Sequence, residues 1–97
     1  MKIVYAPRAI ADLRSISDFI RPRSSRGAKR IRADFLSSIT QLVSFLRLGT
    51  VQTTAPVRKL VTRRYSYLIY YVVHLEVHAI YIIAIRHPSQ QREFEDA

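Results

Sequence analysis

Hydrophobic residues in the C-terminal half of the chain follow the pattern of β-strands. The stretch Val57–His87 contains no Gly or Pro and is rich in β-branched and aromatic residues, which favour strands. Because the links within it are short, it predicts three consecutive antiparallel strands. The expected strands are Val57–Arg63, Tyr67–His74 and Val77–Arg86, with Leu75 and Glu76 near the last turn.

The centre of this stretch, Tyr67–Ile85, is long enough to raise the alternative of a membrane-spanning helix. His74, Glu76 and His78 interrupt it, and its residue types favour strands over helices. The strand interpretation is therefore preferred, and no membrane segment is expected.

Two helices are predicted ahead of these strands, after a short strand at Lys2–Tyr5. The first spans Arg8–Ile20, because Pro7 suits the first turn of a helix and Pro22 ends one. Its apolar residues recur at helical spacing, at Ile10, Leu13, Ile16 and Ile20.

The second helix is predicted over Ser25–Leu48, where apolar residues recur every three or four positions for more than five turns. Ser24 or Ser25 supplies its N-cap, and Gly49 is expected to end it in a left-handed conformation. Gly49–Pro56 then links the helix to the sheet.

The expected fold is α+β, with the order β-α-α-β-β-β and two helices packed on a small antiparallel sheet. A chain of 97 residues has enough apolar content for one modest core, so residues 1–97 are expected to form a single domain. Within it, 88–97 is a short polar C-terminal tail.

Alternation along the strands assigns their side chains to two faces of the sheet. One face of the middle strand carries Tyr67, Ile69, Tyr71 and Val73, and the other carries Leu68, Tyr70, Val72 and His74. On the last strand, strict alternation places Ile83 and Ile85 opposite Ile82 and Ala84. Two helices cover only one apolar face well, so the other face is either curled over by the sheet or available to a protein partner.

The charge of the chain suggests an anionic partner. It has 16 Lys and Arg residues against 7 Asp and Glu, a formal net charge of +9, and three of the acids lie after Arg92. Nucleic acid, the ribosome or an acidic protein would suit such a body, although a merely soluble basic surface is an alternative. The cations gather near the start of the second helix, where they oppose its dipole, at Arg21, Arg23, Arg26, Lys29, Arg30 and Arg32.

Several classes of site are not indicated. The chain has no cysteine, and Glu76 is the only carboxylate near His74 and His78, so neither a disulfide nor a metal site is predicted. No phosphate loop or other cofactor motif is present, and no cofactor is expected. The N-terminus lacks the apolar core of a signal peptide, which makes a cytoplasmic protein the default expectation. A DNA-binding helix-turn-helix is disfavoured, because the second helix is too long and strands follow it.

Three groups of residues can be compared in order with known families. The first group is Tyr5-Ala6 followed by Ala11-Asp12-Leu13, Ile16 and Phe19-Ile20. The second group is Arg58-Lys59-Leu60 followed by Tyr65, Tyr67 and Ile69-Tyr70-Tyr71. The third group runs from Ile82 to Arg86-His87. Together, they resemble the first strand and helix, the following strand pair and the last strand of the RelE/ParE family of bacterial type II toxins.

This resemblance implies a toxin that is encoded beside a cognate antitoxin and forms a hetero-oligomeric complex with it. An acidic, partly disordered C-terminal segment of the antitoxin would wrap and block the basic toxin. The expected antitoxin contacts are Leu13, Phe19, Ile20, Tyr70, Tyr71 and Tyr81.

The favoured interpretation is a ParE-like toxin, which arrests growth by inhibiting DNA gyrase and is not a nuclease. Its target contacts are expected at Arg86, His87 and Arg92. No Tyr follows Tyr81, whereas many RelE-like toxins present a Tyr in the C-terminal segment, so enzymatic activity is not expected.

Two alternatives remain open. A RelE-like toxin would cleave mRNA on the ribosome without metal, using Arg58, Arg64 and Arg86 as cations and His87 as acid or base. His87 has a structural alternative, in which it bonds a backbone carbonyl beside Pro88. The third hypothesis is a basic nucleic-acid-binding module, in which the start of the second helix binds phosphate.

Overall fold

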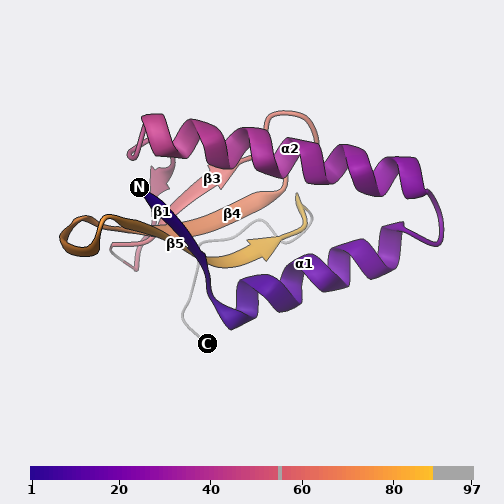
Figure 1. Cartoon of the computed structure of the whole chain (residues 1–97), viewed down its shortest axis with the longest axis horizontal. Helices are drawn as coiled ribbons and strands as arrows, with labels where there is room; N and C mark the ends of the chain where they lie inside the picture. The colour runs from indigo at the N-terminus through magenta and orange to yellow at the C-terminus, as the bar shows by residue number, and fades with distance from the viewer. Residues whose placement is uncertain (55, 89–97) are drawn as a thin grey trace.

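The computed structural model describes residues 1–54 and 56–88. The elements in chain order are β1 (Lys2–Tyr5), α1 (Pro7–Ile20), α2 (Ser25–Ser44), β2 (Thr50–Val51), β3 (Arg58–Val61), β4 (Leu68–His74), the short 3-10 helix η1 (Leu75–Val77) and β5 (Ala79–Arg86). Two helices pack on one five-stranded sheet (Figure 1). The predicted α+β fold is therefore confirmed.

The sheet is mixed, with the strand order β1-β5-β4-β3-β2, so the prediction of a purely antiparallel sheet was wrong at β1. The predicted meander of β3, β4 and β5 is antiparallel throughout. β1 pairs in parallel with β5, from Lys2 opposite Ala79 to Tyr5 opposite Ile82, because a crossover through both helices allows parallel pairing. The predicted link Gly49–Pro56 contains the short edge strand β2, which the sequence pattern did not indicate.

The predicted end of the second helix was wrong. Ser24 caps α2, with its Oγ accepting a hydrogen bond from the Gly27 N–H at 2.9 Å, but α2 ends at Ser44 instead of Leu48. Gly49 is not left-handed. The loop after Ser44 leaves the helix because the Tyr71 hydroxyl, on the sheet, donates to the Leu46 carbonyl at 3.0 Å and accepts from the Gly49 N–H at 2.8 Å.

Gly49 is needed for this close approach. A Cβ at this position would lie 2.7 Å from Tyr71 Cε1 and 2.8 Å from the Lys59 carbonyl oxygen in β3. Since one of the two obstacles is backbone, rotating a side chain cannot relieve the clash. We expect Gly49→Ala to lower the free energy of unfolding by about 2 kcal/mol, which urea denaturation would measure.

Gly27→Ala is the matched control, because its Cβ would meet side chains and no distant backbone, with Ser24 Oγ nearest at 3.0 Å, and alanine favours a helix. Similar urea midpoints for the two variants would show that Gly49 is not sterically constrained.

The main core lies between the helices and the sheet. α1 and α2 contribute Ala9, Phe35, Ile39 and Leu42, and the strands contribute Leu60, Ile69, Tyr71, Ile80, Ile82 and Ile85. A second cluster occupies the opposite face of the sheet, with Val57, Leu68, Tyr70 and Ala84 at its centre. The last three are at most 1% exposed, so this part of the second face is not available to a partner.

The predicted faces are correct for β4 and wrong for the end of β5. Tyr70 pairs with Ala84 and Tyr71 with Ile82, which leaves Ile83 as an extra residue in β5. Such a bulge reverses the alternation beyond it. Ile85 consequently joins Ile82 in the main core, while Ile83 packs against the second cluster.

Candidate functional site

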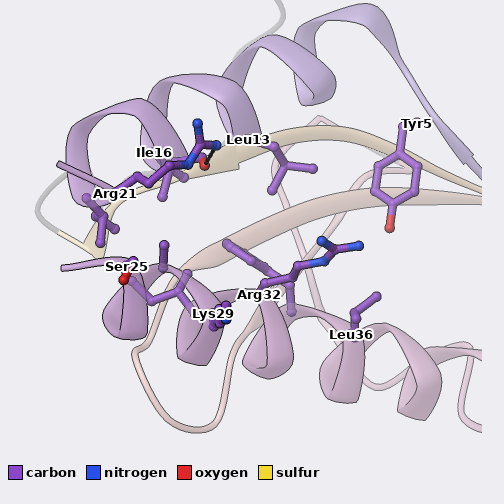
Figure 2. A pocket seen from close by; sticks show the side chains of 13 residues that line it. Tyr5, Leu13, Ile16, Arg21, Ser25, Lys29, Arg32 and Leu36 are labelled. Atoms are coloured by element: carbon purple, nitrogen blue, oxygen red, sulfur yellow. Dashed lines mark hydrogen bonds between the residues drawn. The ribbon is translucent and has the colours of Figure 1, made fainter.

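A groove with a volume of about 510 Å³ runs between α1 and α2 (Figure 2). Its apolar lining consists of Leu13, Ile16 and Ile20 from α1 and Ala28, Ile31, Phe35 and Leu36 from α2. Tyr5 lies at the end nearest the sheet, and three cations add positive charge to the walls: Arg21, Lys29 and Arg32. The groove is therefore both apolar and basic.

The sequence produces this lining through helical spacing. Leu13, Ile16 and Ile20 lie three and four residues apart, which places them on one face of α1, and Ala28, Ile31 and Phe35 repeat the spacing on α2. Leu13 and Ile20 were among the predicted antitoxin contacts, whereas Ile16 and Ile31 were not. The three cations were noted only as part of the basic start of the second helix. The same periodicity identifies the two isoleucines, whereas only the fold shows which helical faces meet.

A carboxylate from each helix binds backbone of the sheet or of a turn between its strands. Asp12 Oδ2 on α1 accepts from the Ile85 N–H at 2.9 Å, just beyond the bulge of β5. Because each helix is fixed to the sheet separately, the two helices can flank a groove instead of closing on each other.

Asp34 is the corresponding residue of α2 and is only 7% exposed. Its Oδ1 accepts from the Arg64 N–H at 3.1 Å and its Oδ2 from the Tyr65 N–H at 3.0 Å. These bonds hold the β3–β4 turn, in which Ser66 has a φ of 60°, against α2. The sequence carried a signal for this contact, because Asp34 is an acid next to Phe35 on the apolar face of α2.

The six predicted antitoxin contacts do not form one surface. Leu13 and Ile20 line the groove, whereas the Phe19 side chain is 62% exposed outside its lining. Tyr81 is 36% exposed on β5, with its ring 5.6 Å from that of His74. Tyr70 and Tyr71 are completely buried and cannot touch a partner in this conformation, because they pack in the two cores.

Three of the four predicted catalytic residues lie at one end of the sheet. Arg64 is in the β3–β4 turn, and Arg86 pairs with Leu68 at the start of β4. His87 follows directly, is exposed, and presents its ring edge to face with Tyr67, at a centroid distance of 5.5 Å. The predicted target residue Arg92 lies outside the described residues.

Arg58 is separated from this group and has a structural contact. It pairs with Tyr71, three ladder positions from the Val61–Leu68 pair, or about 10 Å along the strand. Its Nη1 donates to the Gly49 carbonyl at 2.8 Å. The guanidinium thus holds the same loop that Tyr71 binds.

Tyr71 is also structural. Burial raises the pKa of its hydroxyl above the ordinary tyrosine value, although the Gly49 N–H and the charge of Arg58 act in the opposite direction. Because the pKa of Tyr71 is higher in the folded protein than in the unfolded chain, where it is near 10, its protonated hydroxyl stabilises the fold. This contribution to the free energy of unfolding is complete below about pH 10 and is lost as the pH rises through the pKa of the folded protein. The hydroxyl remains a donor to Leu46 at neutral pH.

Other classes of site find no support within residues 1–54 and 56–88. No three His, Cys, Asp or Glu side chains in these ranges gather as metal ligands. None of the helices there has the length and apolar character needed to cross a membrane.

Comparison with known families identifies the chain. Residues 3–92 match the family model of the ParE toxin of the type II toxin–antitoxin system parDE. The chain belongs to the ParE toxin family. The predicted resemblance to RelE/ParE toxins is therefore confirmed, and the groove is a feature of a ParE-type toxin.

Solved structures of related toxins share the fold of this ParE-family chain. The chromosomal ParDE system from P. aeruginosa has a TM-score of 0.74 and 22% identity, covering 90% of this chain and 95% of that chain. The intact RelBE toxin–antitoxin complex from E. coli has a TM-score of 0.64 and 14% identity, covering 94% of this chain and 98% of that chain.

The isolated RelE toxin from E. coli also has a TM-score of 0.64, with 13% identity, covering 94% of this chain and 87% of that chain. No curated protein sequence matches the chain significantly. The structural likenesses establish a shared fold, and the family match establishes the class of toxin.

Proposed function

We propose that this ParE-family toxin arrests growth by inhibiting DNA gyrase, and that a cognate antitoxin neutralises it by occupying the α1–α2 groove. The observation that carries the antitoxin site is the combination of an apolar lining with the cations Arg21, Lys29 and Arg32. An acidic amphipathic helix is complementary to both features.

The lining of the groove suits a helical occupant. An amphipathic helix places apolar side chains at positions i, i+3, i+4 and i+7 in such a groove. Carboxylates beside these anchors would meet the cations of the walls, which favours an acidic segment over a basic one. Because the toxin carries a net charge of +9, this attraction also accelerates encounter.

Gyrase is favoured over mRNA cleavage by the arrangement of the predicted catalytic residues. A metal-independent nuclease needs an acid, a base and several cations around one phosphate. Arg58 lies apart from Arg64, Arg86 and His87 and is bonded to the Gly49 carbonyl. Burial raises the pKa of Tyr67, the tyrosine beside His87, which disfavours this hydroxyl as a general base.

Arg86 and His87 are the proposed target contacts, together with Arg92. Both described residues lie at the end of the sheet and neither belongs to the groove lining, so the toxin can use different side chains for the target and for the antitoxin. Since gyrase acts in the cytoplasm, the proposal places the toxin there.

A RelE-like mRNA endoribonuclease is the second candidate. The grouping of Arg64, Arg86 and His87 favours it, because these side chains could offer two cations and one acid or base. The toxin would then require the ribosome to position mRNA.

A paired assay on refolded toxin tests the two candidates. We expect loss of gyrase supercoiling, or trapped cleaved DNA, while ribosome-bound mRNA remains intact. We also expect Arg86→Ala with His87→Ala to weaken gyrase inhibition about 10-fold, equivalent to about 1.4 kcal/mol, because these side chains face the target.

The same double variant should bind antitoxin as the parent toxin does, since neither residue lines the groove. Codon-spaced mRNA cuts with normal supercoiling would replace the gyrase proposal by the ribosomal one.

A further inference from the structure

The end of the helical hairpin carries more positive charge than the groove uses. Six cations and no acid occur within residues 21–32, and all six side chains are exposed. This segment lies at the end of the molecule opposite the β4–β5 turn (Figure 1). Among the residues that the structure describes, none of the six forms an ion pair.

Half of these cations lie outside the groove lining. Arg21, Lys29 and Arg32 belong to the lining, but Arg23, Arg26 and Arg30 do not. Arg26 and Arg30 are four residues apart on α2 and therefore share a different face of the helix. An acidic peptide confined to the groove would leave these three arginines, named here the hairpin-end arginines, without an anionic partner.

Arg23 is held in place by the last turn of α1. Its Nη1 donates to the Phe19 carbonyl at 2.6 Å, and its guanidinium carbon lies 4.0 Å from the centre of the Phe19 ring. A guanidinium has five N–H donors, so most of them remain for a ligand. Fixing the side chain in advance lowers the entropy lost when it binds an anion.

The cost of this arrangement also indicates a ligand. α2 has no acidic residue in its first turn, and the cations there oppose the positive end of the helix dipole. A bound polyanion would remove both the repulsion among the arginines and the conflict with the dipole.

We propose that the hairpin-end arginines bind the phosphate backbone of duplex DNA without base specificity. Residues 19–32 contain no Asn or Gln to read adenine and no Tyr to stack on bases, and Arg23 covers one face of the Phe19 ring. Binding of single-stranded nucleic acid usually includes stacking on aromatic side chains, whereas contacts between cations and duplex phosphates carry no sequence information.

The choice of DNA over RNA rests on the proposed function, because gyrase holds duplex DNA. A weak contact to that DNA would raise the effective concentration of the toxin at its target. The hairpin end and the proposed gyrase contacts belong to different parts of the fold, so both could act together.

The test is fluorescence anisotropy of the refolded full-length toxin, without antitoxin, on a short labelled duplex of random sequence. The triple variant Arg23→Gln, Arg26→Gln, Arg30→Gln should bind at least 10-fold more weakly at low salt. Its plot of log affinity against log salt should be shallower by about 0.9 for each phosphate that the variant no longer neutralises.

The matched control is Arg14→Gln, Arg47→Gln, Arg63→Gln, which removes three exposed cations from other parts of the chain. It should retain most of the affinity and the salt slope. Equal losses of affinity in the two triple variants would overturn the proposal, because only net charge would then matter. Tighter binding to single-stranded DNA or duplex RNA would also overturn it.

The single variant Arg26→Gln protects the test against misfolding, because this side chain makes no described contact in the fold, and it should lower the slope by about 0.9. If the parent toxin inhibits gyrase but the two triple variants bind DNA equally well, only this inference is overturned. A selective loss of DNA binding without gyrase inhibition would remove the proposed function and leave the DNA-binding surface.

Discussion

Replacing Asp34 by alanine is expected to lower the free energy of unfolding by about 3 kcal/mol. The carboxylate accepts hydrogen bonds from the backbone of Arg64 and Tyr65 and is the link between α2 and the β3–β4 turn. Hydrogen bonds to a charged group contribute about 1.5–3 kcal/mol each. Water can reach the exposed Arg64 more easily than the half-buried Tyr65, so we expect less than two full contributions.

Urea denaturation measures this effect, and hydrogen exchange of the Arg64 and Tyr65 amides locates it. Asp34→Asn retains one carbonyl acceptor and should lose about half as much stability, which keeps the test informative if the alanine variant does not fold. Asp18→Ala is the matched control, because Asp18 is exposed on α1 and its loss should change stability by at most about 0.5 kcal/mol. Equal stabilities of Asp34→Ala and Asp18→Ala would show that the turn does not depend on this carboxylate.

Ile16→Glu is expected to weaken antitoxin binding at least 100-fold, equivalent to about 2.7 kcal/mol. Ile16 is half-buried in the groove lining, where a carboxylate would replace apolar contact and repel an acidic helix. The measurement is isothermal titration of refolded toxin with its proposed cognate antitoxin.

Ser15→Glu adds the same charge to the same helix at an exposed position outside the groove lining, and it should change the affinity only a few-fold. Circular dichroism checks that both variants fold. Leu36→Glu gives a second reading, because Leu36 lines the groove but is 51% exposed and contributes less to folding. If both groove variants bind antitoxin as Ser15→Glu does, the antitoxin occupies another surface.

The groove lining, which is the proposed antitoxin surface, could be predicted only in part from the sequence. Leu13 and Ile20 belong to a periodic apolar face, and the pattern was enough to select them. Tyr71 has the same apolar and aromatic character on a strand, yet it lies in the main core, since the helices cover that face of β4. The apolar character of a side chain does not predict whether the protein's own core or a partner will bury it.

The grouping of the predicted catalytic residues could also be predicted only in part. Arg64, Arg86 and His87 come together because the β3–β4 turn lies beside the end of β5, which an antiparallel meander predicts. Arg58 was expected to join them, but the register places it three ladder positions away, opposite Tyr71. Register depends on pairing along the whole strand and not on the residue itself.

The amino-acid order alone was enough to predict the two helices, the meander of β3, β4 and β5, and the resemblance to the family. Three features act through neighbouring residues and can therefore be predicted from the local sequence. They are the proline at the start of α1, the Ser24 cap of α2 and the β-branched residues of the meander. The parallel pairing of β1, the bulge at Ile83, the early end of α2 and the groove emerge only when the chain is folded. These features depend on contacts between distant residues, such as Asp12 with Ile85, whose bond joins groups 73 residues apart. Local periodicity carries no information about which distant groups will satisfy each other's hydrogen bonds, and that choice is made when the helices pack on the sheet.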